Sequence, residues 1–92
     1  MPFGFNPGAK ISRHAKKRWR QRVQNPPQHL LELEPSTWLN SRIVNAPGVN
    51  ADEVRLVEVP GQPDMLLTGH HGQNGITVTT TLYADHDRLE DF

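Results

Sequence analysis

The residues best suited to chemistry lie in one short stretch, ISRHAKKRWRQRV, from Ile11 to Val23. His14, Arg18 and Arg22 follow one another at intervals of four residues, which places them on one face of a helix. An imidazole can exchange a proton near neutral pH, and a guanidinium group can bind two phosphate oxygens at once. The set is therefore suited to binding a phosphodiester and to acid–base chemistry on it.

Most of the positive charge of the chain surrounds this set. Seven basic residues precede Glu32 with no acid among them, whereas ten acids and three arginines follow from that position onward. The net charge of zero therefore divides into about +7 and about −7, an asymmetry that indicates a polyanion-binding surface or self-association. The predicted nucleic-acid contacts are Lys10, Arg13, Lys17, Arg18, Arg20 and Arg22.

These residues also have a structural interpretation. The arginines would then form a solvated face or pair within the molecule with Glu32, Glu34 or the C-terminal acids, and His14 would bond a backbone carbonyl near the helix start. Trp19 could stack on a nucleic-acid base, but its spacing favours a place in the core, as does that of Trp38.

An N-terminal helix should position the basic set. Ser12 is suited to cap its first turn, and the NPP sequence at 25–27 should end it near Val23 or Gln24. An apolar stripe recurs every four residues and should be buried: Ile11, Ala15, Trp19 and Val23. The stripe predicts a docked helix and not a loose basic arm.

The remaining pattern predicts an α+β fold, with two or three N-terminal helices packed on one face of a three- or four-stranded antiparallel sheet. Further short helices are expected at 27–34 and 36–41, the second capped by Ser36, or as one kinked helix. Residues 53–59, 64–70 and 75–84 are rich in β-formers and separated by turn sequences, and 42–45 can add a short strand. In the last strand alternation predicts one apolar and one polar face: Ile76, Val78, Thr80 and Leu82 against Thr77, Thr79, Thr81 and Tyr83.

The length of 92 residues allows one small domain. We expect a flexible arm over 1–9, a single α+β domain over 10–84 and an acidic, fraying tail over 85–92. No apolar run approaches the roughly 18 residues of a membrane span, and no leader sequence is apparent. A cytoplasmic protein that does not bind membranes is therefore expected.

Metal and cofactor chemistry is not predicted. The chain has no cysteine, which excludes disulfides, thiolate metal sites and a cysteine nucleophile. His70 and His71 are adjacent and should point to opposite faces of a strand, and the Asp85-His86-Asp87 sequence has no recognised spacing to them. No metal site and no cofactor follow from these residues.

The chain resembles small bacterial and phage proteins of the RelE-like toxin type, which belong to the ribonuclease superfamily that includes barnase, EndoU and colicin nucleases. The resemblance covers roughly residues 10–84. It rests on a His-Ala-x-x-Arg-x-x-x-Arg helix, formed here by His14, Ala15, Arg18 and Arg22, followed by a short helix and an antiparallel sheet that ends in a Val/Thr-rich strand.

This resemblance implies metal-independent cleavage of RNA, in which a ribose 2′-hydroxyl attacks the adjacent phosphate. His14 would be the general acid or base, and Arg18 and Arg22 would hold the phosphate. Tyr83 is a second catalytic candidate and Thr81 a weaker one. The last strand lacks the Arg or Lys that RelE-like toxins usually carry there. This departure bears on catalysis more than on RNA binding, so whether the protein is an enzyme stays open.

Two non-enzymatic functions compete with this interpretation. The first is a phage-type host-takeover or regulatory protein, whose charge-segregated surface docks onto a host protein or nucleic acid. The second is a toxin-neutralising or assembly partner whose acidic half mimics a polyanion. Opposite charges in the two halves of the chain would also allow a homodimer.

Overall fold

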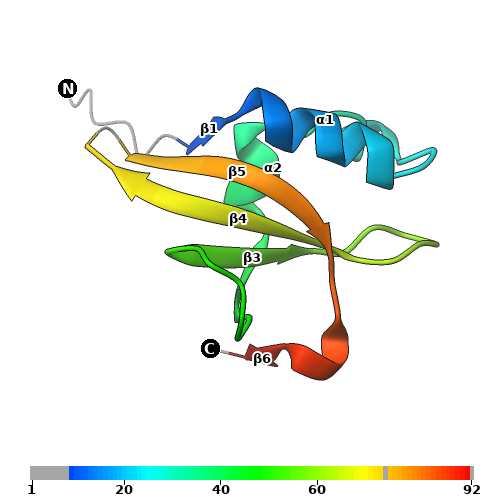
Figure 1. The fold of residues 1–92 in the computed structure, drawn as a ribbon. Coiled ribbons are helices and arrows are strands. Elements are labelled where there is room, and N and C mark those ends of the chain that lie inside the picture. The colour runs from blue at the N-terminus through cyan, green and yellow to red at the C-terminus, as the bar shows by residue number, and fades with distance from the viewer. Residues whose placement is uncertain (1–8, 74, 92) are drawn as a thin grey trace.

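The computed structural model describes residues 9–73 and 75–91, and these form an α+β fold, as the sequence predicts (Figure 1). The predicted arm, residues 1–9, lies outside the described residues except for Ala9. The elements are β1 Ala9–Ile11, α1 Arg13–Arg22, η1 Gln28–Leu30, α2 Pro35–Leu39, β2 Arg42–Asn45, β3 Glu53–Val57, β4 Met65–Gly72, β5 Gly75–Tyr83, η2 His86–Arg88 and β6 Glu90–Asp91.

The sheet is larger than predicted and mixed in direction. In the described part of the chain it has six strands in the order β1-β5-β4-β3-β2-β6. β1 pairs parallel with β5, and β6 pairs antiparallel with β2. The expectation of three or four antiparallel strands was therefore incomplete, because strands of two and three residues are too short to show an alternation.

The predicted C-terminal tail is part of the fold. Residues 85–91 form η2 and β6, and Leu89 packs against apolar residues on the face of the sheet opposite to α1. The carboxylate of Glu90 also accepts a hydrogen bond from Nδ2 of Asn45 at 3.0 Å. The segment that was expected to be an acidic tail therefore pairs with β2 at residues 90 and 91.

The helix α1 forms where the apolar stripe predicts, except that Ile11 lies in β1 and is only partly buried. The Ser12 hydroxyl accepts a hydrogen bond from the Ala15 backbone N–H at 3.0 Å and caps the first turn. Ala15, Trp19 and Val23 are buried, and the Trp19 Nε1–H donates to the Leu30 carbonyl at 3.0 Å. Trp19 is therefore a core residue with its polar group satisfied.

The second helical region is shorter than predicted. η1 covers three residues, and α2 begins at Pro35, one residue before the expected cap. Glu34 is the N-cap residue, and the Thr37 hydroxyl accepts a hydrogen bond from its backbone N–H at 3.2 Å. Proline is favoured at the first helical position because its fixed φ fits and it has no N–H to satisfy, so Pro35 starts this helix.

Both faces of the sheet carry apolar clusters. The cluster under α1 and α2 contains the two tryptophans and, from β4, Met65 and Leu67. The opposite face was expected to be polar, but a second cluster lies there, to which residues of the β2–β3 loop and of the segment after β5 contribute. Its buried members are Val44, Ala46, Val54, Leu56 and Leu66.

The predicted alternation in β5 is interrupted at Thr79. Thr68 pairs with Thr80, and the next residue, Gly69, pairs with Val78, so Thr79 has no partner of its own. Such a bulge reverses which face the following residues occupy. The expected grouping of Ile76 and Val78 with Leu82 was therefore wrong: Ile76 and Val78 pack under the helices, whereas Leu82 packs on the opposite face.

Close packing at Gly69 yields a test of this fold. A Cβ atom at Gly69 would lie 2.6 Å from Trp38 Cη2 and 2.8 Å from Ile76 Cδ1. We expect Gly69→Ala to lower the free energy of unfolding by about 1–3 kcal/mol because the core must shift, measured by urea denaturation. Gly72→Ala is the control, since its Cβ would meet nothing closer than 3.7 Å. Equal midpoints for the two variants would contradict this packing.

Candidate nucleic-acid interface

The helix α1 is held along β5 mainly by uncharged groups. The Ser12 backbone N–H donates to the Val78 carbonyl at 3.0 Å, and the Ser12 hydroxyl donates to the Thr79 carbonyl at 3.2 Å. The buried Thr81 hydroxyl donates to the Ala15 carbonyl at 3.1 Å. Together with the buried stripe, these bonds dock the helix while most of its cations point away from the sheet.

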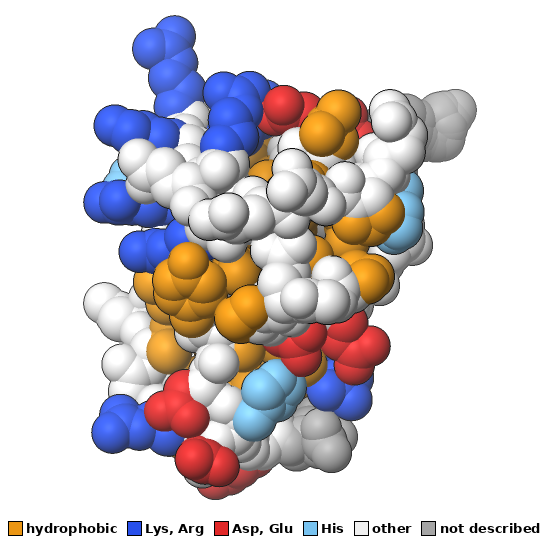
Figure 2. Space-filling view, turned by 90° about the vertical axis from the view of Figure 1, so that its right-hand side faces the viewer, with side chains coloured by type: hydrophobic (Ala, Val, Ile, Leu, Met, Phe, Trp, Pro, Cys, Tyr) orange, Lys and Arg blue, Asp and Glu red, His pale blue; other side chains and the backbone are white. Residues whose placement is uncertain are grey.

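The basic residues from Lys10 to Arg22 form the surface that we call the basic face. Lys10, Arg13, Lys16, Lys17 and Arg20 are exposed, and Arg18 and Arg22 are half-buried. Figure 2 shows Lys and Arg side chains gathered along the upper left of the molecule, with acidic side chains mainly in the lower half. The charge asymmetry of the sequence therefore persists in three dimensions.

Few acids of the same chain neutralise the basic face. Arg20 pairs with Glu32 at 2.9 Å, with both side chains exposed, and within residues 9–73 and 75–90 no other cation of the basic face lies within 4.0 Å of a carboxylate. Asp85 instead pairs with Arg88 at 3.5 Å. The alternative of pairing within the molecule accounts for Arg20 alone.

His14, Arg18 and Arg22 lie in three different settings along α1. The His14 side chain is exposed, and Arg18 donates to Gln21 Oε1 at 2.9 Å on the surface. Arg22 reaches the sheet, where its Nη1 donates to the Thr81 carbonyl and its guanidinium carbon lies 5.4 Å from the centre of the Tyr83 ring. Arg22 therefore has a fixed position, whereas His14 faces solvent.

The structure separates the two predicted catalytic residues. At about 1.5 Å of rise per residue, His14 lies about 12 Å along the helix axis from Arg22, and Tyr83 lies beside Arg22. Tyr83 is 53% exposed and thus accessible to a ligand. Thr81, the weaker candidate, is buried and bonded to the helix backbone, which is a structural role.

The sheet adds little positive charge to this interface. Arg55 packs over Trp38, with its guanidinium carbon 4.8 Å from the ring centre, and donates to the Trp38 and Ser41 carbonyls at 3.2 and 3.3 Å. It also pairs with Glu53 at 2.6 Å. Arg55 thus satisfies carbonyls at the end of α2, a role that its place in an alternating strand did not reveal.

The described residues contain no group of three or more His, Asp or Glu side chains that could hold a metal ion. His70 and His71 are neighbours on β4, and His86 Nε2 lies 2.9 Å from Asp64 Oδ2 on another part of the surface. Within the same residues, no helix combines the length and the apolar character that crossing a membrane requires.

Comparison with protein-family models, with curated proteins and with solved structures finds no match to this chain. The RelE-like resemblance therefore stays a prediction that rests on the residues of α1. The class of the protein follows here from its geometry alone: an α+β domain with a basic helix docked against a mixed sheet.

Loss of the Ser12 hydroxyl tests how α1 is attached. Ser12→Ala removes both the cap on Ala15 and the bond to the Thr79 carbonyl. We expect it to lower the free energy of unfolding by about 1 kcal/mol, measured by thermal or urea denaturation. Ser36→Ala in α2 is the control, since Ser36 is exposed. A Ser12 variant as stable as the control would show that the stripe alone holds the helix.

Proposed function

We propose that the protein binds RNA through the basic face of α1. The observation that carries this proposal is that six of the seven cations between residues 10 and 22 have no carboxylate within 4.0 Å in residues 9–73 and 75–90, although acids and bases are equally numerous in the chain. Like charges crowded on one helix repel one another, and a phosphate backbone would relieve that repulsion and release bound counterions.

The fixed position of Arg22 supports recognition of a phosphate at one end of this face. Its guanidinium is already oriented by the Thr81 carbonyl and the Tyr83 ring, so less conformational entropy is lost when it binds. Arg18 lies one turn away on the same side of the helix. The RelE-like resemblance, carried by these two arginines and His14, favours RNA over other polyanions.

We extend the proposal to cleavage without a metal ion. The ribose 2′-oxygen would attack the adjacent phosphorus, the bond from phosphorus to the 5′-oxygen would break, and the products would be a 2′,3′-cyclic phosphate and a free 5′-hydroxyl. His14 would take the proton from the 2′-hydroxyl or give one to the 5′-oxygen. Tyr83, two helical turns away beside Arg22, would contact the strand at another nucleotide.

Removing charge from the basic face tests the binding. We expect Arg13→Gln with Lys17→Gln to weaken binding of a single-stranded RNA about tenfold and to reduce the slope of log affinity against log salt by roughly 1 to 2, because two phosphate contacts are lost. Fluorescence anisotropy at several salt concentrations measures both quantities.

The matched control removes two exposed arginines elsewhere, with Arg42→Gln and Arg88→Gln. This variant has the same change in net charge and should bind almost as tightly as the unmodified protein. Equal losses in the two double variants would mean that RNA responds to net charge, and the assignment to α1 would be wrong.

The catalytic part is tested separately with His14→Ala. We expect this variant to bind RNA with unchanged affinity and to cleave it at least 100-fold more slowly, with products analysed for a 2′,3′-cyclic phosphate in the presence of EDTA. His71→Ala, another exposed histidine, should cleave normally. If the unmodified protein leaves both free and ribosome-bound RNA intact, the cleavage proposal fails and the binding proposal stands.

A further inference from the structure

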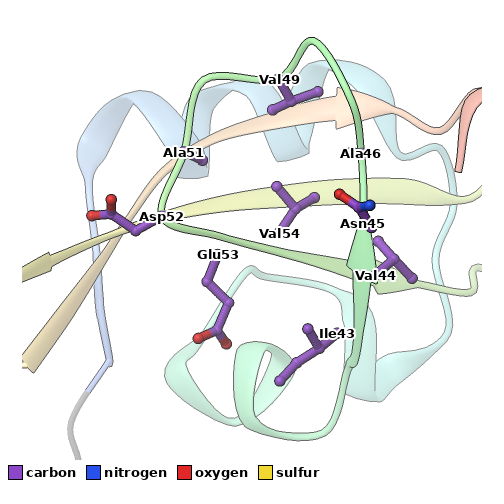
Figure 3. A pocket seen from close by; sticks show the side chains of 9 residues that line it. All are labelled: Ile43, Val44, Asn45, Ala46, Val49, Ala51, Asp52, Glu53 and Val54. Carbon is purple, nitrogen blue, oxygen red and sulfur yellow. The ribbon is translucent and has the colours of Figure 1, made fainter. Parts of the chain in front are cut away.

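A hollow of about 420 Å³ lies on the β2–β3 hairpin, away from the helices. Figure 3 shows the loop between the two strands arching over it, with apolar side chains along its wall. We call it the hairpin hollow. Its volume falls in the range of roughly 300–1,000 Å³ that is usual for binding pockets. The apolar residues that line it are Ile43, Val44, Ala46, Val49, Ala51 and Val54.

The wall of the hairpin hollow is held in place by backbone hydrogen bonds and by the Asp52 side chain. The Val49 N–H donates to the Ala46 carbonyl at 3.1 Å, in a turn where Gly48 has a φ of 89° that few other residues adopt. At the other end of the loop, the Asp52 N–H donates to the Gly69 carbonyl at 3.0 Å, and Asp52 Oδ2 accepts the His71 N–H at 2.8 Å. These bonds and the turn at Gly48 shape the loop that borders the hollow.

The charge around the hairpin hollow is negative. Asp52 and Glu53 lie at one end of it (Figure 3), and Glu90 bonds to Asn45 in its wall at 3.0 Å. Glu53 is neutralised by Arg55 at 2.6 Å. Asp52 and Glu90 have no cationic side chain within 4.0 Å in the described part of the chain.

Part of the apolar wall is open to solvent. Ile43, which lines the hollow, is 39% exposed. An apolar hollow next to uncompensated carboxylates attracts a ligand that combines apolar side chains with positive charge. A polyanion such as RNA would be repelled from this surface.

We propose that the hairpin hollow docks a peptide segment of another protein, in which one or two large apolar side chains are flanked by Lys or Arg. This interaction is independent of RNA binding by α1. A second copy of the chain is a poorer occupant, because the apolar residues of its own basic segment, Ala15, Trp19 and Val23, are buried and cannot serve as anchors.

Three labelled twelve-residue peptides test the proposal in fluorescence anisotropy. The first alternates Lys with Leu or Phe, the second has Ser in place of the apolar residues, and the third has Glu in place of Lys. We expect the first to bind at least tenfold more tightly than either of the others. Failure of the first peptide to bind at up to about 1 mM, or equal binding of the second, overturns the proposal.

Variants of the protein locate the binding. Ile43→Ser should weaken the first peptide at least fivefold, whereas Leu31→Ser, which removes a side chain that is 51% exposed elsewhere, should not. Asp52→Asn with Glu90→Gln changes only exposed side chains and should reduce both the affinity and its salt dependence. RNA binding should be unchanged in each variant.

Two results would assign the hairpin hollow differently. Equal effects of Ile43→Ser and Leu31→Ser would place the peptide elsewhere on the surface. Dimerisation of the unmodified protein in analytical ultracentrifugation that Ile43→Ser abolishes would make a second copy the occupant. Either result overturns docking of a foreign basic peptide in this hollow and leaves the RNA-binding proposal untouched.

Discussion

The unpaired residue Thr79 in β5 is the constraint on which the arrangement of the helix and sheet depends. Because Thr79 has no partner in β4, the residues after it exchange faces, and Thr81 comes to lie under α1, where its hydroxyl bonds the Ala15 carbonyl. Tyr83 is brought beneath Arg22 by the same shift. Hydroxyls of Thr68 and Thr79, 2.8 Å apart, bond across the irregularity.

Docking of α1 by its apolar stripe and by hydroxyl groups leaves its cations available to a ligand. If ion pairs attached the helix, its cations would be neutralised by carboxylates of the same molecule. In residues 9–73 and 75–90, only Arg20 of the basic face forms such a pair. The β2–β3 hairpin has the opposite charge character, with an apolar hollow beside Asp52 and Glu90. The two surfaces would thus favour ligands of opposite charge.

Local signals predicted some elements well and others poorly. The Ser12 cap and the four-residue apolar stripe correctly predicted α1, since both are encoded within one segment. The predicted helices at 27–34 and 36–41 left out Pro35, although proline is well suited to begin a helix, as it does in α2. The sequence predicted which residues belong to the candidate site but not how they are arranged. Arg22 and Tyr83 meet because segments that are distant in the chain pack together. The exposure of His14 depends on how the helix lies on β5.

The sequence alone determined the α+β class, the apolar stripe and the concentration of positive charge in one helix, because each depends on the order of residues within a short window. The tertiary structure decided which cations form ion pairs and which face of the sheet Thr81 and Tyr83 occupy. It also decided that the C-terminal segment adds a strand to the sheet. A shift of one residue in strand pairing exchanges the faces of every later side chain, and such pairing joins residues far apart in the chain.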